Sequence, residues 1–577
     1  MRTPVPGPIT PPGGDGMSES QSIAATFLER VFGSAPVATS LPQVASQAAS
    51  ASSPFPSAFP SSPFNDFGPA PTSGLPSEAS AFASRSASDS IPAPVVAAMA
   101  ANSSGAEMPA SAIQQAVSRL RDLADQSFRQ KTASFGGSQV AAPQSKHVGD
   151  GARSVLRSTH TAPPGESLHG DRSRPFDISS VRADFPALHQ SIHGFSLVWF
   201  DNAATTHKPL QVIEAMSSFY AHDYSNIHRA AHALAARATD HYEAARQTVA
   251  ETIRASSSDD IVFVRGTTEG INLIANITKG FLREGDEILL SEFEHHANIV
   301  PWQMVAREVR ARIRVVPFDN SGEVLMEEYR RLLGPRTRLV SLTHASNTLG
   351  TVLPVEEMTR LAHQHGARVV IDGAQSIAHM PVDVQAIGCD FFVFSGHKVF
   401  APTGIGVVYV HPDLHEMLPP WQGGGNMIRR VAFDETTYAD APAKFEAGTP
   451  SIGDAVGLGS ALRYLRQFDP VSVEAHEHAL LEHATRELKS IRGVTIYGNA
   501  SHKVGLVSFT LDGYTTEMVG RELDRVGIAV RTGHHCAQPS LRHFGLEATI
   551  RPSFALYNTH DEVERMIEVI LRLSRKR

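Results

Sequence analysis

Lys398 is the residue with the clearest capacity for covalent chemistry, because it closely follows an apolar run that is typical of a buried strand, DFFVF at 390–394. Ser395 and His397 lie beside it in the sequence. Burial and neighbouring cations lower the pKa of a lysine and produce a neutral amine, which can form a Schiff base. A lysine after a strand is more often simply solvated, so Lys398 alone leaves both interpretations open.

A carboxylate stands at the corresponding point of another apolar run. The run RVVID at 368–372 ends in Asp372, and Gln375 follows one turn later. Such a carboxylate could cap the backbone, bind a metal or pair with a cationic cofactor. The metal interpretation lacks support, because no His or Asp at ligand spacing accompanies Asp372. We therefore predict no metal site.

A third run leads into a possible phosphate site. IVFV at 261–264 is followed by Gly266, Thr267 and Thr268, which open a helical pattern. The free backbone amides of a helix N-terminus, together with hydroxyl groups, suit a phosphate. The same residues also make an ordinary helix cap.

The three features together indicate one cofactor, pyridoxal 5′-phosphate. This cofactor needs a phosphate site, a carboxylate for its pyridinium nitrogen and a lysine for its aldehyde. In open α/β sheets, ligands bind beyond the carboxyl ends of the strands, where all three features occur. The combination therefore favours the catalytic interpretation of Lys398, Asp372 and the Thr267–Thr268 pair.

The elements that must position these residues alternate between apolar runs and helical patterns from Phe176 to Arg577. This alternation predicts an α/β fold with a largely parallel sheet. Stretches such as PVEEMTRLAHQHGA have helical spacing and separate the runs. The expected strands lie at 261–264, 287–290, 313–317, 338–342, 368–372 and 390–394.

A smaller α+β unit is expected after about Asp454, where LGSALRYLRQF, GLVSFTL and EVERMIEVILRLSR occur. We expect a large domain over about 200–450. The small domain should combine the segment before residue 200 with about 455–577. A cleft between two such domains is the expected site.

Ten motifs in order resemble one family, the cysteine desulfurases of the SufS type (class II), which are similar to selenocysteine lyases. They are DNAATTHKP, NIHRAAH, RGTTEGIN, SEFEHHANIVPWQ, SNTLGT, IDGAQS, FSGHKVFAPTGIG, FEAGTPS, RTGHHCAQP and RPSFALYNT. The resemblance runs from about Phe176 to the C-terminus. It implies the fold of the fold-type I pyridoxal-phosphate transferases, with a large mixed, mainly parallel sheet domain and a small C-terminal α+β domain.

The resemblance also implies roles for individual residues. Lys398 would carry the cofactor's aldehyde, Asp372 would pair with the pyridinium nitrogen and Gln375 would bind the phenolic oxygen, while His295 would stack on the ring and take part in catalysis. The remaining cofactor contacts would come from Thr267, Thr268, Ser395, His397 and, from a second subunit, Thr449. The last contact implies a homodimer.

The substrate implied by the resemblance is L-cysteine, and the nucleophile is Cys536 of RTGHHCAQP. The residues that would bind the substrate are Asn347, Arg531 and Arg551. Cys536 lies in a polar loop, whereas Cys389 of AIGCDFFVF fits a small buried apolar residue. The short RTGHHCAQP loop is the SufS-type form, so the persulfide on Cys536 would pass to an acceptor protein.

Composition excludes several other classes of protein. The 577 residues carry a net charge of −8, which gives no reason to expect nucleic acid or an anionic membrane as a partner. The two cysteines cannot supply the disulfides of a secreted scaffold. No apolar stretch is long enough to span a membrane, and no signal peptide is evident. A cytoplasmic protein is expected.

Residues 1–175 differ in composition from the rest of the chain. They contain 21 of the 37 prolines and none of the tyrosines, tryptophans or cysteines. We expect this leader to be mostly disordered. Two segments, SESQSIAATFLERVFG and SAIQQAVSRLRDLADQSFR, have helical spacing and could dock on a partner or pack on their own enzyme. The leader resembles those of desulfurases packaged inside encapsulin shells, which implies a shell protein as a partner and a location inside that compartment.

Two other functions compete with the desulfurase. One is a selenocysteine lyase or another pyridoxal-phosphate enzyme of the same fold, which would release selenium without a nucleophilic cysteine. The other is a non-catalytic shell-organising protein. The presence of Lys398, Asp372, Arg551 and Cys536 together argues against the second alternative.

Overall fold

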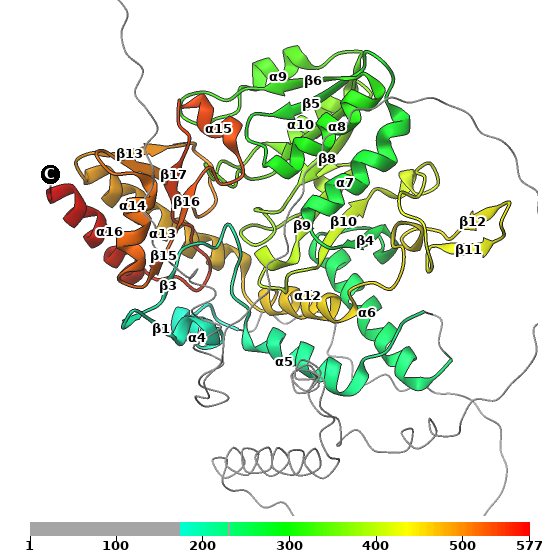
Figure 1. Ribbon diagram of the computed structural model, residues 1–577, viewed down its shortest axis with the longest axis horizontal. Helices are drawn as coiled ribbons and strands as arrows, with labels where there is room; N and C mark the ends of the chain where they lie inside the picture. The colour runs from blue at the N-terminus through cyan, green and yellow to red at the C-terminus, as the bar shows by residue number, and fades with distance from the viewer. Residues whose placement is uncertain (1–173, 229–230, 577) are drawn as a thin grey trace, which may run out of the picture. The chain divides into compact units, whose positions relative to one another are not determined.

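A seven-stranded sheet forms the centre of the catalytic region in the computed structural model, which describes residues 174–228 and 231–576 (Figure 1). Its strand order across the sheet is β4-β10-β9-β8-β7-β5-β6. The strands are β4 (Ile261–Val264), β5 (Glu287–Ser291), β6 (Arg312–Val316), β7 (Thr337–Thr343), β8 (Arg368–Asp372), β9 (Phe391–Ser395) and β10 (Gly406–Val410). All six predicted strands are present, so the predicted sheet is confirmed.

The sheet is mixed and mainly parallel, as predicted. Strands β6, β5, β7, β8 and β9 pair in parallel. Strand β10 runs antiparallel to both β9 and β4, so β4 points in the same direction as the parallel strands. The carboxyl ends of β4, β5, β7, β8 and β9 therefore lie along one edge of the sheet.

Side chains alternate between the two faces of the sheet and fill a separate apolar core on each. Val340, Ile371 and Phe392 belong to one core, whereas Leu339 and Val370 belong to the other. Burial on both faces explains why these strands read as continuous apolar runs. The surrounding helices are α5 (Leu210–Ser218), α6 (Ala233–Thr252), α7 (Thr267–Thr278), α8 (Val300–Val309), α9 (Met326–Leu332), α10 (Val355–Gln364), α11 (Val384–Ile387) and α12 (Ile452–Leu465).

A four-stranded antiparallel sheet organises the smaller C-terminal unit. Its strands are β13 (Val494–Tyr497), β14 (Ser508–Leu511), β16 (Arg531–Gly533) and β17 (Thr549–Arg551), and its helices are α13 (Pro470–Ser490), α14 (Thr516–Asp524), α15 (Gln538–His543) and α16 (His560–Arg575). Val198 and Phe200 lie in the core of this unit. Strand β3 (Val198–Trp199) pairs in parallel with β15 (Ile528–Ala529). Residues 198–200 therefore pack with the C-terminal unit, whereas Val181, Phe185 and Leu188 lie in a core of the large sheet.

Helix α12 differs from our expectation, because it packs with the large sheet and not with the smaller unit. It contacts α5 and α6, and Leu458 and Leu462 lie in one core of the large sheet. Its glycines allow this close packing, since a Cβ at Gly459 would lie 3.0 Å from Ala245. The boundary that we placed near Asp454 therefore falls after α12.

The remaining elements are short. They include α4 (Ile178–Ala183), β1 (Ser191–Ile192), β2 (Phe195–Ser196) and a hairpin of β11 (Ile428–Val431) and β12 (Thr436–Tyr438), which projects away from the large sheet in Figure 1. The predicted leader segments lie outside the described residues. Among the helices of the described part, none is both long and apolar enough to cross a membrane.

Candidate active site

A cavity of about 190 Å³ lies at the carboxyl ends of the parallel strands and gathers almost all of the predicted site residues. These are Thr267, Thr268, His295, Asn347, Asp372, Gln375, Ser395, His397, Lys398, Arg531, Cys536 and Arg551. A larger cavity of about 440 Å³, lined by Glu251, Met380 and Phe468, contains none of them. The chemistry predicted from separate motifs therefore converges in one place.

Lys398 ends a short 3₁₀ turn, η6 (Gly396–Lys398), that directly follows β9. Burial lowers the pKa of its amine to about 8, with the nearby Asp372 acting in the opposite direction and Arg551 adding to the decrease. With a pKa near 8, roughly a tenth of the amine is neutral at pH 7, far more than for an ordinary lysine. Lys398 is therefore suited to attack an aldehyde.

Asp372 is the last residue of β8 and is buried. One oxygen accepts a hydrogen bond from the backbone N–H of Ala374 at 3.0 Å. Burial raises the pKa of this carboxyl, while the Ala374 N–H and Lys398 lower it. A cationic group in the cavity would offset the cost of keeping this buried carboxylate charged.

The start of α7 forms the predicted phosphate end. Gly266 is the N-cap residue of this 12-residue helix. The N–H of Thr267 donates to Oγ of Ser395 at 2.8 Å, which joins the helix start to the end of β9. His397 lines the same cavity, and burial together with Lys398 lowers its pKa to about 4. The site thus offers backbone amides, hydroxyls and a neutral imidazole.

His295 lines the cavity from the segment that follows β5. Its Nδ1 accepts the backbone N–H of Ala297 at 3.0 Å, so a proton on this ring is carried by Nε2. Burial, and next the charge of Lys398, lowers the pKa of His295 to about 3. The imidazole is therefore neutral, as suits a ring that would stack on a cationic pyridinium.

Arg551, on β17, provides a buried cation at the other side of the cavity. Its Nη1 donates to the carbonyl oxygen of Asn347 at 2.6 Å, and its Nη2 lies 3.2 Å from Oδ1 of Asp201. Burial lowers its pKa to about 10, so the guanidinium stays charged at neutral pH. Its Nε and the Oδ1 of Asn347 find no hydrogen-bond partner among the residues that the structure describes. These free groups suit an amino acid substrate.

Asp201 is a site residue that the sequence analysis missed. Arg531 and Arg551 lie directly opposite each other on β16 and β17, and such a like-charge pair is unfavourable. Asp201 lies close to both guanidinium groups, at 3.2 Å from Arg551 and 3.9 Å from Arg531. Its position in the DNAATTHKP motif was the available signal, but nothing local in that motif pointed to two arginines more than 300 residues away.

Cys536 reaches the same cavity from a tight loop after β16. It is partly exposed, whereas Cys389 is fully buried, as predicted. Burial raises the pKa of the Cys389 thiol well above its usual range. Of the two cysteines, Cys536 alone is placed to react with a ligand in the cavity.

Two of the predicted cofactor contacts, Gln375 and Thr449, lie in different places. Gln375 donates from Nε2 to the carbonyl oxygen of Ala203 at 2.7 Å and remains at the cavity. Thr449 is exposed and lines a different cavity, together with Arg265 and Trp421. Within a single chain, Thr449 is therefore not part of the site.

The residues present fit pyridoxal 5′-phosphate. The cavity combines a lysine of lowered pKa, a buried carboxyl, the amides of a helix N-terminus and a buried guanidinium with an unpartnered Nε. Each of these groups has a counterpart on the cofactor or on its amino acid substrate. The predicted cofactor therefore agrees with the chemistry of the site.

Comparison with known proteins agrees with this geometry. Residues 198–566 match the model of the aminotransferase class-V family. The chain therefore belongs to the aminotransferase class-V family, a family of pyridoxal-phosphate enzymes.

Within that family, the similar proteins are cysteine desulfurases. The chain is 54% identical over 417 residues to the cysteine desulfurase of Synechococcus elongatus. This alignment covers 72% of this chain and 67% of that protein. It is 48% identical over 402 residues to the cysteine desulfurase of Shigella flexneri, in an alignment that covers 69% of this chain and 99% of that protein. The chain spans 64% of the length of a probable cysteine desulfurase of Mycolicibacterium paratuberculosis.

The solved structures lead to the same group. The apo cysteine desulfurase of Thermococcus onnurineus superposes with a TM-score of 0.67 at 35% identity, over 69% of this chain and 98% of that one. The cysteine desulfurase CsdA of Escherichia coli superposes with a TM-score of 0.65 at 38% identity, over 70% of this chain and 99% of that one. The catalytic region is thus that of a pyridoxal-phosphate-dependent cysteine desulfurase.

Proposed function

We propose that this protein transfers the sulfur of L-cysteine to Cys536 as a persulfide and releases L-alanine, in the manner of the SufS-type enzymes. The observation that carries this proposal is that Cys536 and Lys398 line the same cavity of about 190 Å³. A selenocysteine lyase would not need a thiol there. The short RTGHHCAQP loop supports the SufS-type assignment.

The residues of the site divide the work as follows. The guanidinium of Arg551 binds the α-carboxylate of the substrate, because a planar fork matches the two oxygens better than a point charge does. Asn347 holds this guanidinium through its carbonyl oxygen at 2.6 Å. Lys398, whose pKa is lowered to about 8, would hold the aldehyde of the cofactor and would move the α-proton of the substrate.

The cofactor, when bound, supplies an electron sink for the pair of electrons left at the substrate α-carbon. Asp372 supports that role, because its carboxylate would keep the pyridinium nitrogen protonated. His295 is neutral and lies at the cavity, where it would face the ring. The hydroxyls of Thr267, Thr268 and Ser395 would hold the phosphate.

The sulfur transfer step balances without an added oxidant or reductant. The thiol of Cys536 loses its proton and its Sγ forms a bond to the substrate sulfur. The bond between that sulfur and the substrate Cβ breaks, and its electron pair stays with Cβ, which accepts a proton. The two sulfurs are oxidised to a persulfide while Cβ is reduced to the methyl group of alanine. A thiol on an acceptor protein would then remove the outer sulfur.

A direct test measures alanine and persulfide from L-cysteine in the purified holoenzyme. Mass spectrometry should find one added sulfur atom on Cys536, and Cys536→Ala should abolish it while leaving the visible absorption of the cofactor intact. Cys389→Ala is the matched control, because it removes the other cysteine, which lies outside the cavity. Wild-type alanine formation from L-cysteine in Cys536→Ala would disprove the proposal.

We also propose a homodimer in which Thr449 of each chain completes the phosphate site of the other. The exposure of Thr449, away from its own cavity, supports this arrangement. Mixing two inactive variants, Lys398→Ala and Thr449→Ala, should restore part of the activity, because one site of each mixed dimer then has both residues. Recovery that never exceeds the activity of the separate variants would contradict it.

The leader supports a further proposal, packaging of the enzyme inside an encapsulin-type shell. Residues 1–175 resemble the leaders of such cargo enzymes, although they lie almost wholly outside the described residues. The truncated enzyme should keep Arg174 as its first native residue, because Arg174 forms an ion pair with Asp184 and stacks on Phe468. Truncation should leave activity unchanged and abolish co-purification with the shell protein. Loading of the truncated enzyme would refute this proposal.

A further inference from the structure

The loop that carries Cys536 has an unfavourable backbone conformation that its surroundings must maintain. His535 and Cys536 have φ angles of +53° and +55°, which place two consecutive non-glycine residues in the left-handed region. Each such residue costs about 1–2 kcal/mol relative to a right-handed conformation. Backbone in this state persists only when several contacts hold it.

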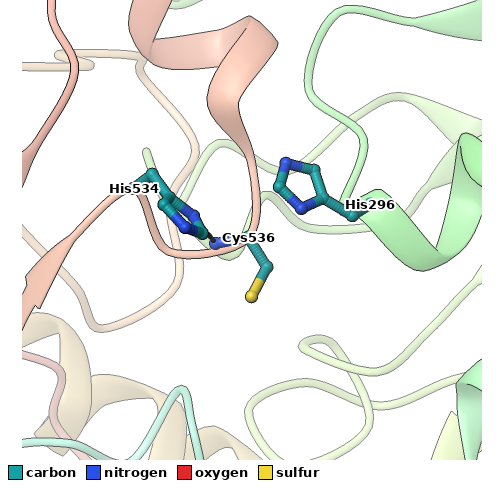
Figure 2. A group of neighbouring side chains, drawn as sticks. All are labelled: His296, His534 and Cys536. Carbon is teal, nitrogen blue, oxygen red and sulfur yellow. Dashed lines mark hydrogen bonds between the residues drawn. The ribbon is translucent and has the colours of Figure 1, made fainter. Parts of the chain in front are cut away.

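His296 makes contacts on both sides of Cys536. Its backbone N–H donates to the carbonyl oxygen of Cys536 at 2.7 Å. Its side-chain Nε2 accepts the backbone N–H of Gln538 at 3.2 Å. Figure 2 shows the rings of His296 and His534 on either side of Cys536, and the centroids of the two rings are 5.5 Å apart. One residue thus joins the loop through both its main chain and its side chain.

The same cluster has the residue types of a metal site, but its hydrogen bonds use the nitrogen lone pairs. The candidate ligand atoms of His296, His534 and Cys536 lie within 4.8 Å of one another. Nδ1 of His534 accepts the backbone N–H of Cys536 at 3.0 Å, as Nε2 of His296 accepts that of Gln538. A backbone N–H can only donate, so in each neutral ring the proton is on the other nitrogen. The rings act as acceptors for the loop.

The charge state of His296 agrees with this role. Burial, and next the charge of His534, lowers the pKa of His296 below its usual value. The ring is therefore neutral at physiological pH and keeps a lone pair for Gln538. Protonation would place a second N–H against the backbone donor and break this contact.

We propose that His296 is a positioning residue that holds the Cys536 loop over the cofactor site, acting through its Nε2 acceptor. The proposal rests on the function proposed above. Its neighbour His295 lies at the cofactor cavity, so a single dipeptide fixes both the imidazole that faces the ring and the loop that carries the nucleophile. The distance between the nucleophile and the ring is then set within one short segment after β5.

The test compares His296→Gln with His296→Met in the holoenzyme. The two side chains have similar length and volume, but only glutamine offers an oxygen that can accept the Gln538 N–H. Single-turnover persulfide formation should fall about 10- to 100-fold in His296→Met, the range expected when a reacting group is misplaced by about 1 Å. His296→Gln should keep most of the wild-type rate.

Two further measurements separate this role from general damage. The change in cofactor absorbance on addition of L-cysteine, which precedes sulfur transfer, should stay at the wild-type rate. Alkylation of Cys536 by iodoacetamide should become faster in His296→Met, because a released loop exposes the thiol. His478→Ala is the control and should change none of these quantities, because His478 is an exposed residue of α13 that does not line the cavity.

The outcomes distinguish the two proposals. Equal persulfide rates in His296→Met and wild type, or equal losses in the Met and Gln variants, would overturn the positioning role of His296. Slowing of the absorbance change together with persulfide formation would also overturn it. Cys536→Ala, measured in parallel, tests the proposed function itself. Continued turnover of L-cysteine by this variant would show that Cys536 is not the nucleophile.

Discussion

Lys398 and Cys536 line the same cavity, but they are held there in different ways. Lys398 follows β9, a buried strand with a hydrogen-bonded neighbour on each side, so the backbone that carries it is fixed by the central sheet. Cys536 lies on a loop of the smaller unit whose backbone is left-handed at two successive residues. That loop is held by the backbone N–H of His296 and by three side chains: the rings of His296 and His534 and the amide of Asn347.

This difference corresponds to the two tasks of the site. Chemistry at the cofactor needs groups that do not move, and preorganised groups at the ends of sheet strands provide them. The nucleophile must meet a substrate sulfur and afterwards present its persulfide to an acceptor. A loop supported by a few replaceable hydrogen bonds suits a group that has to serve two partners. Variants on the sheet side, around Lys398, and variants on the loop side, around Cys536, should therefore lose activity in different ways.

The largest effect is expected on the sheet side, from Lys398→Ala. Turnover of L-cysteine should fall by at least about 10³-fold, since the chain loses both the covalent anchor and a proton-transfer group. The loop should be unaffected, so Cys536 should still react with iodoacetamide at the wild-type rate. A large change in that alkylation rate would show that the two sides are coupled more tightly than their contacts indicate.

Asp372→Ala should give the next largest effect. The variant should retain the visible absorption of the bound cofactor, because Lys398 and the phosphate site are intact. Turnover should fall about 100-fold or more, since loss of the buried carboxylate removes the group that keeps the ring nitrogen protonated. Absorbance and alanine release together check this prediction. Substantial turnover in the variant would contradict the role assigned to Asp372.

Arg551→Lys tests the boundary between the two sides, because Arg551 is on β17 of the smaller unit. The ammonium cannot reproduce the two parallel hydrogen bonds of a guanidinium, a loss of about 1.5–3 kcal/mol that corresponds to roughly 10- to 100-fold in binding. KM for L-cysteine should rise accordingly, with a smaller change in kcat. Steady-state kinetics at saturating cofactor measure both. An unchanged KM would place the substrate carboxylate elsewhere.

The smallest effect is a pH dependence that belongs to the sheet side. The pKa of Lys398 is lowered to about 8, so the neutral amine is the minor form at pH 7 and the major form at pH 9. Cofactor uptake by the apoenzyme should therefore accelerate as pH rises from 7 to 9, by about tenfold, and then level off. Stopped-flow absorbance records this rate. Alkylation of Cys536 should not follow the same curve.

The sequence supported many of these conclusions because the relevant signals are local. A buried parallel strand reads as a continuous apolar run, and all six predicted strands were found. The residues that follow such runs must lie at one sheet edge, so the sequence alone predicts that Thr267, Asp372 and Lys398 lie close together. The position of α12 was less predictable, because its glycines, and not its apolar spacing, decide which core it enters.

The site residues that could not be predicted depend on contacts between distant segments. Asp201 is 350 residues from Arg551, and only the register of β16 and β17 shows that two arginines need a carboxylate between them. His296 is 242 residues from Gln538 in the cysteine loop that it contacts. Neither residue has a neighbour in the sequence that hints at its partner.

The sequence by itself determined which chemical groups this protein possesses and which of them follow strands, because apolar periodicity and turn residues are properties of short segments. Only the tertiary structure decided which groups meet: the thiol with the amine, the two arginines with Asp201, and His296 with the loop around Cys536. The physical reason is that hydrogen bonds and charge interactions act over a few ångströms. Their energies therefore depend on where the packed cores place each segment, and not on its position along the chain.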